Sequence, residues 1–319
     1  MTTLPLLSLA IWVPIFAGIL VLLTGDDKNA SSARWIALLG ALAAFLVTIP
    51  LYTGFNIADG GFQFQEGFSW IPTFNIHYHL GADGIAVPLI LLTSFTTVLV
   101  VIAGWEVIEK RVAQYMASFL IMSGLMIGVF SALDAILYYV FWEAMLIPMF
   151  LVIGVWGGPN RVYATIKFFL YTLLGSLLML VAFIYLFYQT NSFEIVDYYR
   201  LPMSLQVQTL VFLAFFMAFA VKIPMWPVHT WLPDAHVEAP TPVSIILAGV
   251  LLKIGGYGII RICYGIFPEA AIYFSYWIGL IGVLSIIYGA FIALASTDLK
   301  RMIAYSSISH MGFVILGIA

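Results

Sequence analysis

Ten long apolar segments restrict the fold of this chain more than any other feature of its sequence. The hydrocarbon core of a bilayer is about 30 Å thick, and a helix needs roughly 20 apolar residues to cross it. The segments that meet this length cover residues 4 to 23, 34 to 52, 84 to 105, 112 to 132, 135 to 156, 163 to 188, 207 to 232, 243 to 262, 271 to 294 and 302 to 319. Hydrophobic residues make up 63% of the chain and charged residues only 8%. We therefore predict an all-α integral membrane protein with about 10 transmembrane helices.

The lysines and arginines between these segments predict the orientation in the membrane. Cytoplasmic loops carry an excess of these residues. With the N-terminus outside, only Arg200 and Arg261 lie on the outer side. The basic residues on the inner side are then Lys28, Arg34, Lys110, Arg111, Arg161, Lys300 and Arg301. This asymmetry supports both the number of spans and their direction.

The longest polar connection, residues 53 to 83, alternates aromatic and polar side chains between glycines. This pattern predicts a short β-hairpin on the outer face. His77 and His79 have the spacing of a strand and are candidate metal ligands. No carboxylate or cysteine set accompanies them in the sequence, so we favour a plain surface strand.

Five of the fourteen prolines fall between Lys222 and Pro242. A proline has no backbone donor and clashes with the carbonyl four residues earlier, so Pro224, Pro227 and Pro233 predict a break in the seventh helix. If the helix ended at Pro224, Lys222 would lie at the interface and extend to water. If it resumes through Met225 to Leu232, Lys222 lies near the middle of the membrane beside freed carbonyls. We favour the second interpretation.

Charged side chains inside the other spans are candidate functional residues, because a charge at the bilayer centre costs about 2.5–3.5 kcal/mol. Glu143 lies near the middle of its span, and Lys253 lies about eleven residues into the eighth. A structural ion pair remains an alternative role for Glu143. Lys167 is four residues into its span, where interfacial and buried positions are equally compatible with the sequence.

Two histidines extend this set. His310 lies in the middle of its span and is either a proton carrier or a histidine hydrogen-bonded to a neighbouring helix. His229 follows Lys222 by seven residues, two turns along the same face if the helix resumes. Other polar groups have plainer interpretations: solvated loop capping for Asp234, His236 and Glu238, and a helix N-cap for Asp134.

Together these groups are typical of a proton relay. A buried lysine suits this role because burial and a nearby carboxylate act on its proton affinity in opposite directions. Cys263 is the single cysteine, so no thiolate set could hold an iron–sulfur cluster or zinc. The sequence shows no nucleotide-binding motif, and its net charge of −3 gives no reason to expect a nucleic-acid partner.

Four motifs occur here together. They are Trp142-Glu143 followed by Pro148, the run from Lys222 to Ser244, the run from Leu252 to Gly258, and the run from Ser296 to Gly312. This combination closely resembles the antiporter-like membrane subunits of NADH:quinone oxidoreductase, or complex I. The resemblance covers essentially the whole chain.

The resemblance implies a proton channel built from inverted five-helix repeats. Its expected parts are N-terminal helices and the hairpin in residues 1–111, a first repeat with a broken seventh helix in 112–262, and the start of a second repeat in 263–319. It assigns Glu143 as the carboxylate that modulates Lys222, Lys222 as the proton-accepting lysine and Lys253 as the central relay. It also implies that the sequence stops before the second half-channel, so that the chain is C-terminally truncated.

The same resemblance implies partners and a location. The chain itself would hold no cofactor, while partner subunits would carry FMN and iron–sulfur clusters and the complex would use quinone. Neighbours would be other membrane subunits and the lipid bilayer, in a bacterial inner membrane or a mitochondrial inner membrane. Alternatives are a subunit of a multi-subunit sodium/proton antiporter or membrane-bound hydrogenase, and a structural membrane scaffold.

Overall fold

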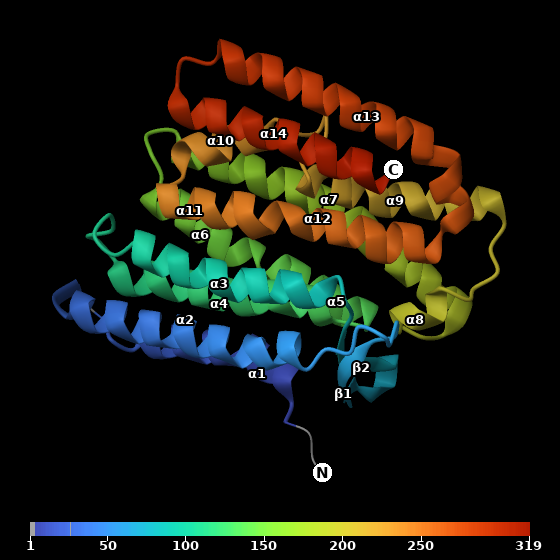
Figure 1. Ribbon diagram of the computed structural model, residues 1–319, viewed down its shortest axis with the longest axis horizontal. Coiled ribbons are helices and arrows are strands. Elements are labelled where there is room, and N and C mark those ends of the chain that lie inside the picture. The colour runs from blue at the N-terminus through green and yellow to red at the C-terminus, as the bar shows by residue number, and fades with distance from the viewer. Residues whose placement is uncertain (1–3, 26) are drawn as a thin grey trace. The chain divides into compact units, whose positions relative to one another are not determined.

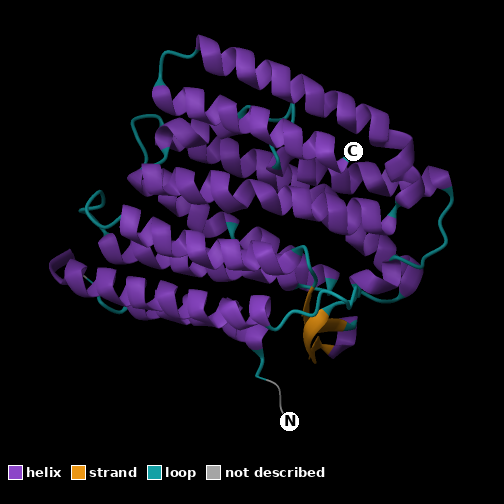
Figure 2. Ribbon diagram, in the orientation of Figure 1, coloured by secondary structure: helices purple, strands orange, loops and turns teal. Residues whose placement is uncertain are grey.

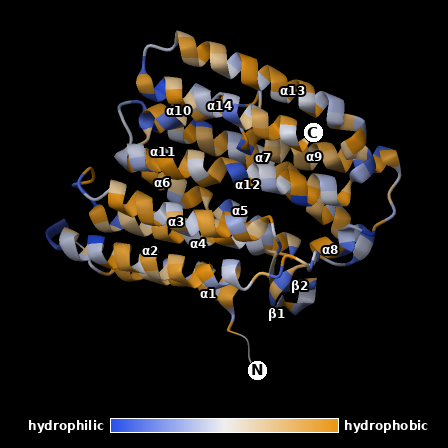
Figure 3. Cartoon of the chain, viewed as in Figure 1, coloured by the Kyte–Doolittle hydropathy of each residue, from blue (hydrophilic) through white to orange (hydrophobic). Residues whose placement is uncertain are grey.

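The computed structural model describes residues 4–25 and 27–319 as a series of helices with one β-hairpin (Figures 1 and 2). Within these residues nine helices or helix pairs are long and apolar enough to cross a membrane, and α1 is a shorter apolar helix of 17 residues. Hydrophobic colours run along most helices in Figure 3. The prediction of an all-α membrane protein is confirmed.

The chain forms two compact units. Unit one is Met1–Val152 with Thr241–Val250, and unit two is Ile153–Pro240 with Leu251–Ala319. Elements of unit one are α1 Leu6–Leu22, η1 Asp27–Asn29, α2 Ala30–Thr53, β1 Gln63–Ile71, η2 Pro72–Phe74, β2 Ile76–Ala82, α3 Ala86–Ala103, α4 Val112–Ser131, α5 Ala135–Ala144 and α11 Thr241–Ile246. Elements of unit two are α7 Arg161–Thr190, α8 Ile195–Tyr198, α9 Leu205–Lys222, α10 Trp231–Glu238, α12 Leu252–Gly258, η4 Ile259–Tyr264, α13 Pro268–Ala295 and α14 Leu299–Ile318. Two elements cross the unit boundaries, α6 Leu146–Trp156 and η3 Leu247–Leu251.

Small residues allow the helices of unit one to pack closely. Ala37 and Ala41 lie on the buried face of α2. A Cβ built on Gly40 would lie 2.4 Å from the Cβ of Ala17, so α1 and α2 are in close contact there. Van der Waals packing of this kind matters in a membrane because lipid leaves little hydrophobic force between helices.

The predicted hairpin is present, with β1 and β2 antiparallel. Asn75 closes its turn at a φ of 55°, in the left-handed region that asparagine tolerates better than most residues. Glu66 of β1 accepts hydrogen bonds from the backbone N–H groups of Leu7, at 2.7 Å, and Ser8, at 3.0 Å. The hairpin thus caps the N-terminus of α1, where unpaired N–H groups need acceptors.

The fifth predicted span is interrupted at Met145, between α5 and α6. Pro148 explains this interruption, because it has no N–H to donate to the carbonyl of Ala144 four residues earlier. Glu143 therefore lies at the C-terminal end of a short helix rather than in the middle of a continuous one. At the other end of α5, Asp134 accepts hydrogen bonds from Ile136 and Leu137, as predicted for an N-cap.

Candidate functional site

The proline-rich segment of unit two ends α9 at Lys222, and its backbone groups find new partners. Pro224 cannot donate to the carbonyl of Ala220, which instead accepts the N–H of Met225 at 3.0 Å. The Val221 carbonyl, left without its helical donor, accepts the indole Nε1–H of Trp231 at 2.8 Å. The carbonyls of Ala220 and Val221 that the interruption frees are therefore both hydrogen-bonded, one to the backbone and one to a side chain.

The continuation of this helix differs from the prediction. We expected it to resume through Met225 to Leu232, but residues 223–230 form turns and α10 begins at Trp231. Pro224 and Pro227 remove two successive chances to rebuild the helical hydrogen-bond pattern, which explains the longer gap. His229 consequently lies in a turn and does not continue the helix face of Lys222.

Lys222 is buried at this break, with 1% of its surface exposed. Its Nζ lies 6.0 Å from the ring centroid of Phe168 on α7. A lysine at the interface would extend its ammonium to water. Its enclosure by protein argues against the alternative in which Lys222 extends to water at the interface, whereas its depth in the membrane remains a prediction.

Lys253 lies on α12, a helix of seven residues between the π-helical segments η3 and η4. Short π-helical insertions are frequent at functional sites. α12 packs directly against α9, since a Cβ on Gly258 would lie 2.3 Å from the Phe219 ring and one on Gly255 would lie 2.5 Å from Ile223. The two glycines thus bring the helix of Lys253 against the helix that ends at Lys222.

Lys167 forms an ion pair with Asp234, with 2.7 Å between Nζ and Oδ2. Its side chain is 18% exposed and that of Asp234 is 26% exposed. One turn further along α7, the hydroxyl of Tyr171 hydrogen-bonds to Thr230 at 2.9 Å. Lys167 is therefore half-buried and joins α7 to α10.

The prediction that Asp234, His236 and Glu238 lie in a solvated loop is wrong. All three lie on α10, and His236 is only 2% exposed. Lys300 of α14 stabilises the end of this helix by donating to the carbonyls of Val237 and Ala239. α10 was not predicted because three prolines in ten residues suggested an open loop, although Pro233 is tolerated in the first turn of a helix.

The environment of His236 opposes its protonation. Burial is the main cause, and the nearby charge of Lys300 adds to it, so the pKa of His236 is lowered from 6.5 to about 4. α10 lies outside the long apolar helices. The imidazole of His236 is therefore neutral near pH 7.

The ring of His229 lies among aromatic residues of α13 and α14. Its centroid is 5.0 Å from that of Tyr288 and 6.5 Å from that of Tyr305. His229 is 2% exposed. His310 is also on α14, but its side chain is exposed. It follows Tyr305 by five residues, and the two therefore point to different faces of the helix.

The predicted attraction between Glu143 and Lys222 remains a prediction. Glu143 is half-buried in unit one, whereas Lys222 belongs to unit two. Their individual environments are nevertheless alike, because each lies at the last turn of a helix that a proline interrupts.

A line of polar side chains on α7 was not predicted as a unit. Tyr163, Lys167 and Tyr171 are spaced by four residues, so they share one helix face. Only the charged member of this line was considered. The spacing was the available signal, and it would have predicted polar partners on whichever helix packs against that face.

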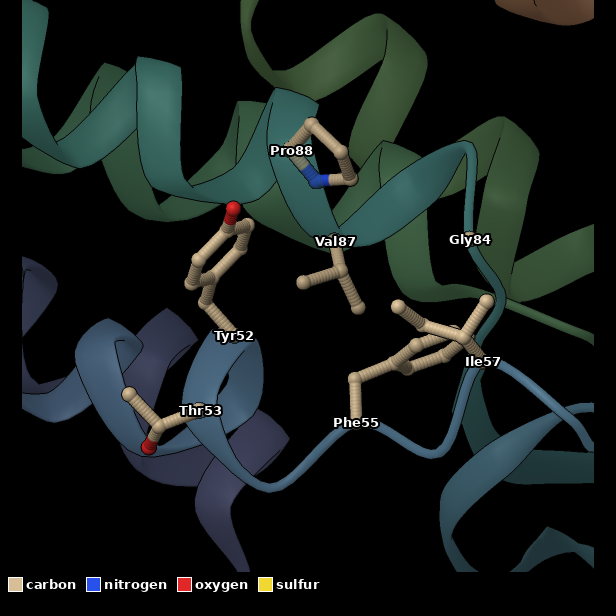
Figure 4. A pocket seen from close by; sticks show the side chains of 7 residues that line it. All are labelled: Tyr52, Thr53, Phe55, Ile57, Gly84, Val87 and Pro88. Carbon is tan, nitrogen blue, oxygen red and sulfur yellow. The ribbon is translucent and has the colours of Figure 1, made fainter.

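A separate cavity in unit one has a different character (Figure 4). It has a volume of about 580 Å³ and lies where α2 ends and α3 begins. Its lining residues are Tyr52, Thr53, Phe55, Ile57, Gly84, Val87 and Pro88. It contains no carboxylate, histidine or lysine, so it lacks the groups that a proton path requires.

Comparison with known proteins places these features in a family. The family model described as NADH:quinone oxidoreductase/Mrp antiporter, transmembrane, matches residues 132–319. The chain belongs to this family. A second model, for the amino terminus of NADH-ubiquinone oxidoreductase chain 4, matches residues 42–131. Both agree with the resemblance on which the sequence interpretation was based.

Individual members of the NADH:quinone oxidoreductase/Mrp antiporter family match nearly all of the chain. NADH-quinone oxidoreductase subunit M of Rhodobacter capsulatus is 46% identical, over 98% of this chain and 64% of the relative. The subunit M of Rickettsia prowazekii is 42% identical, over 100% of this chain and 66% of the relative. The chain thus spans just under two thirds of the length of these relatives.

Solved structures show the same fold. A chain of respiratory complex I from Thermus thermophilus, with bound NADH, superimposes with a TM-score of 0.87 at 32% identity, covering 98% of this chain and 64% of that one. A chain of the Mrp complex from Dietzia gives a TM-score of 0.85 at 22% identity, covering 98% and 34%. The second likeness concerns the fold alone.

Proposed function

We propose that this chain is a proton-translocating membrane subunit of respiratory NADH:quinone oxidoreductase. The observation that carries the proposal is the burial of Lys222 at a break in α9, directly against the helix of Lys253. A lysine in such a position can exchange a proton with a neighbour when a nearby charge changes. The likeness to subunit M proteins supports this choice within the family.

In this mechanism the chain moves protons and takes no electrons. Protons load Lys222 and pass through ordered water to Lys253, and the charge of Glu143 modulates how strongly Lys222 holds them. His229 extends the path on the input side and His310 beyond Lys253. Water is needed because relay residues on separate elements exchange protons only through hydrogen-bonded contacts.

The driving energy comes from partner subunits in this proposal. Those subunits carry FMN and iron–sulfur clusters, and the complex reduces quinone. Further membrane subunits and lipid surround the chain in a bacterial inner membrane. This assignment rests on the relatives, whose names place them in NADH-quinone oxidoreductase.

The test is to replace single charges in the assembled complex. We expect Glu143→Gln, Lys222→Ala and Lys253→Ala to lower proton pumping by on the order of 100-fold, the usual contribution of a proton-transfer group. Pumping is measured as acidification of inverted membrane vesicles during NADH oxidation. Lys28→Ala, which removes an exposed lysine of η1, is the matched control and should pump normally.

Three outcomes separate the alternatives. Normal pumping in all three variants would contradict the proposal. Failure of the neutral variants to assemble, with normal pumping by whatever complex does assemble, would support a structural scaffold. Pumping that requires sodium and proceeds without NADH oxidation would support a sodium/proton antiporter.

A further inference from the structure

A small polar cavity lies at the surface of unit two. It has a volume of about 190 Å³, which is space for several water molecules. Its lining residues are Asn160, Tyr163, Ala164, Asp234, Val237, Glu238 and Arg301. The starts of α7 and α14 contribute to it, and the basic residues Arg161 and Lys300 beside it belong to the side predicted to be cytoplasmic. The cavity therefore lies at the end of unit two that is predicted to face the cytoplasm.

The two carboxylates in this cavity have different roles. Glu238 accepts the backbone N–H of Asn160 at 2.9 Å, and its backbone carbonyl accepts that of Gly158 at 2.9 Å. It therefore fixes the connection before α7. Asp234, by contrast, pairs with a side chain, that of Lys167, and its own side chain remains 26% exposed. Asp234 is the carboxylate of this cavity that can exchange protons with water.

Polar side chains continue inward from the cavity on two helices. On α14, Arg301 lines the cavity and Tyr305 follows one turn later on the same face. The Tyr305 hydroxyl interacts electrostatically with both Asp234 and Lys167. Its ring centroid lies 6.5 Å from His229 and 6.5 Å from Tyr288.

His229 is the innermost residue of the polar series that starts at Arg301 and continues through Tyr305 and Tyr288. His229 is only 2% exposed, and among the described residues its ring nitrogens have no side-chain hydrogen-bond partner, the backbone of Pro227 being the one polar group that interacts with the ring. A buried imidazole with so few partners is costly unless water or a proton donor reaches it. Two residues later, the indole of Trp231 bonds the carbonyl of Val221, which directly precedes Lys222. This polar series therefore ends next to the break in the helix at Lys222.

We propose that this cavity is the proton entrance of the chain, with Asp234 as its first proton acceptor, Lys167 as the residue that positions Asp234, and Tyr305 and Tyr288 as the connection to His229. The inference rests on the proposed function. A proton from water binds the Asp234 carboxylate and leaves toward the hydroxyl of a tyrosine, which releases its own proton inward. Bridging water is required because the ring separations exceed hydrogen-bond lengths.

The experiment uses the assembled complex in inverted vesicles, where the cytoplasmic side faces the medium. We expect Asp234→Asn to slow proton uptake by on the order of tenfold at pH 8, less than loss of an internal relay group, because water retains part of the access. The defect should shrink as the medium is brought to pH 6, since more protons are then available. Asp234→Glu restores a carboxylate and should recover most of the uptake that Asp234→Asn loses at pH 8.

Lys167→Gln separates positioning from proton transfer. It removes the ion pair but keeps the acceptor, and we expect a smaller loss than for Asp234→Asn. Equal losses in the two variants, with no dependence on the pH of the medium, would show a purely structural ion pair and overturn the proposal. Glu269→Gln removes a carboxylate that does not line the cavity and should change nothing.

Tyr305→Phe keeps the inference testable if Asp234→Asn fails to assemble. This change keeps the ring and removes only the hydroxyl, so we expect full assembly and a several-fold loss of uptake at pH 8. Normal uptake would overturn the proposed connection. If Lys253→Ala loses pumping while Asp234→Asn and Tyr305→Phe keep normal uptake, the proposed entrance is wrong and the proposed function still stands. Normal pumping in Glu143→Gln, Lys222→Ala and Lys253→Ala would contradict the proposed function itself.

Discussion

Trp231 shows how a single side chain supports the break beside Lys222. Its indole bonds the Val221 carbonyl at 2.8 Å, and its ring packs on Phe168. Trp231→Phe keeps the packing but leaves the buried carbonyl without this donor, and we expect a loss of about 1–3 kcal/mol in unfolding free energy. Thermal unfolding in detergent measures this loss. Trp277→Phe, at a ring that is 57% exposed, should cost less than about 0.5 kcal/mol, and equal effects of the two changes would contradict the role of the indole.

At the scale of elements, the contact between α9 and α12 depends on Gly258. A methyl group there would lie 2.3 Å from the Phe219 ring, one turn before Lys222. We therefore expect Gly258→Ala to displace Phe219 or separate the helices, with a loss of about 1–3 kcal/mol in unfolding free energy and slower proton transfer. Vesicle acidification and thermal unfolding check both effects. Gly317→Ala has open space at its Cβ and should not destabilise the fold. An unchanged Gly258→Ala protein would show that the helices are not in close contact.

The helices and the site were predictable to different degrees. Length and hydrophobicity predicted the spans because the bilayer imposes them directly. The extent of the break after Lys222 was not predictable, because it depends on which donors reach the freed carbonyls, and Trp231 is ten residues away from Val221 in the chain. The role of Asp234 as an ion-pair partner was not predicted, for a similar reason. Its ion pair with Lys167 joins residues 67 positions apart, and only the packing of α10 on α7 reveals it.

For the whole molecule, the neutral state of His236 predicts how stability depends on pH. The pKa of His236 is about 4 in the folded state against 6.5 when unperturbed. Above pH 6.5 the group is neutral in both the folded and the unfolded state, and it does not affect the balance. As the pH falls from 6.5 to about 4, His236 binds a proton in the unfolded state but not in the folded state. The free energy of unfolding therefore decreases by roughly 3 kcal/mol in total.

The measurement that checks this prediction is thermal unfolding in detergent between pH 7.5 and pH 4, compared between the unchanged chain and His236→Gln. We expect the variant to lose less stability over this range, because glutamine does not titrate. Other groups contribute equally to both proteins and cancel in the difference. His310→Gln is the matched control, since it removes a histidine whose side chain is exposed, and it should keep the full pH dependence. Parallel curves for the unchanged chain and His236→Gln would mean that burial in α10 does not hold this imidazole neutral.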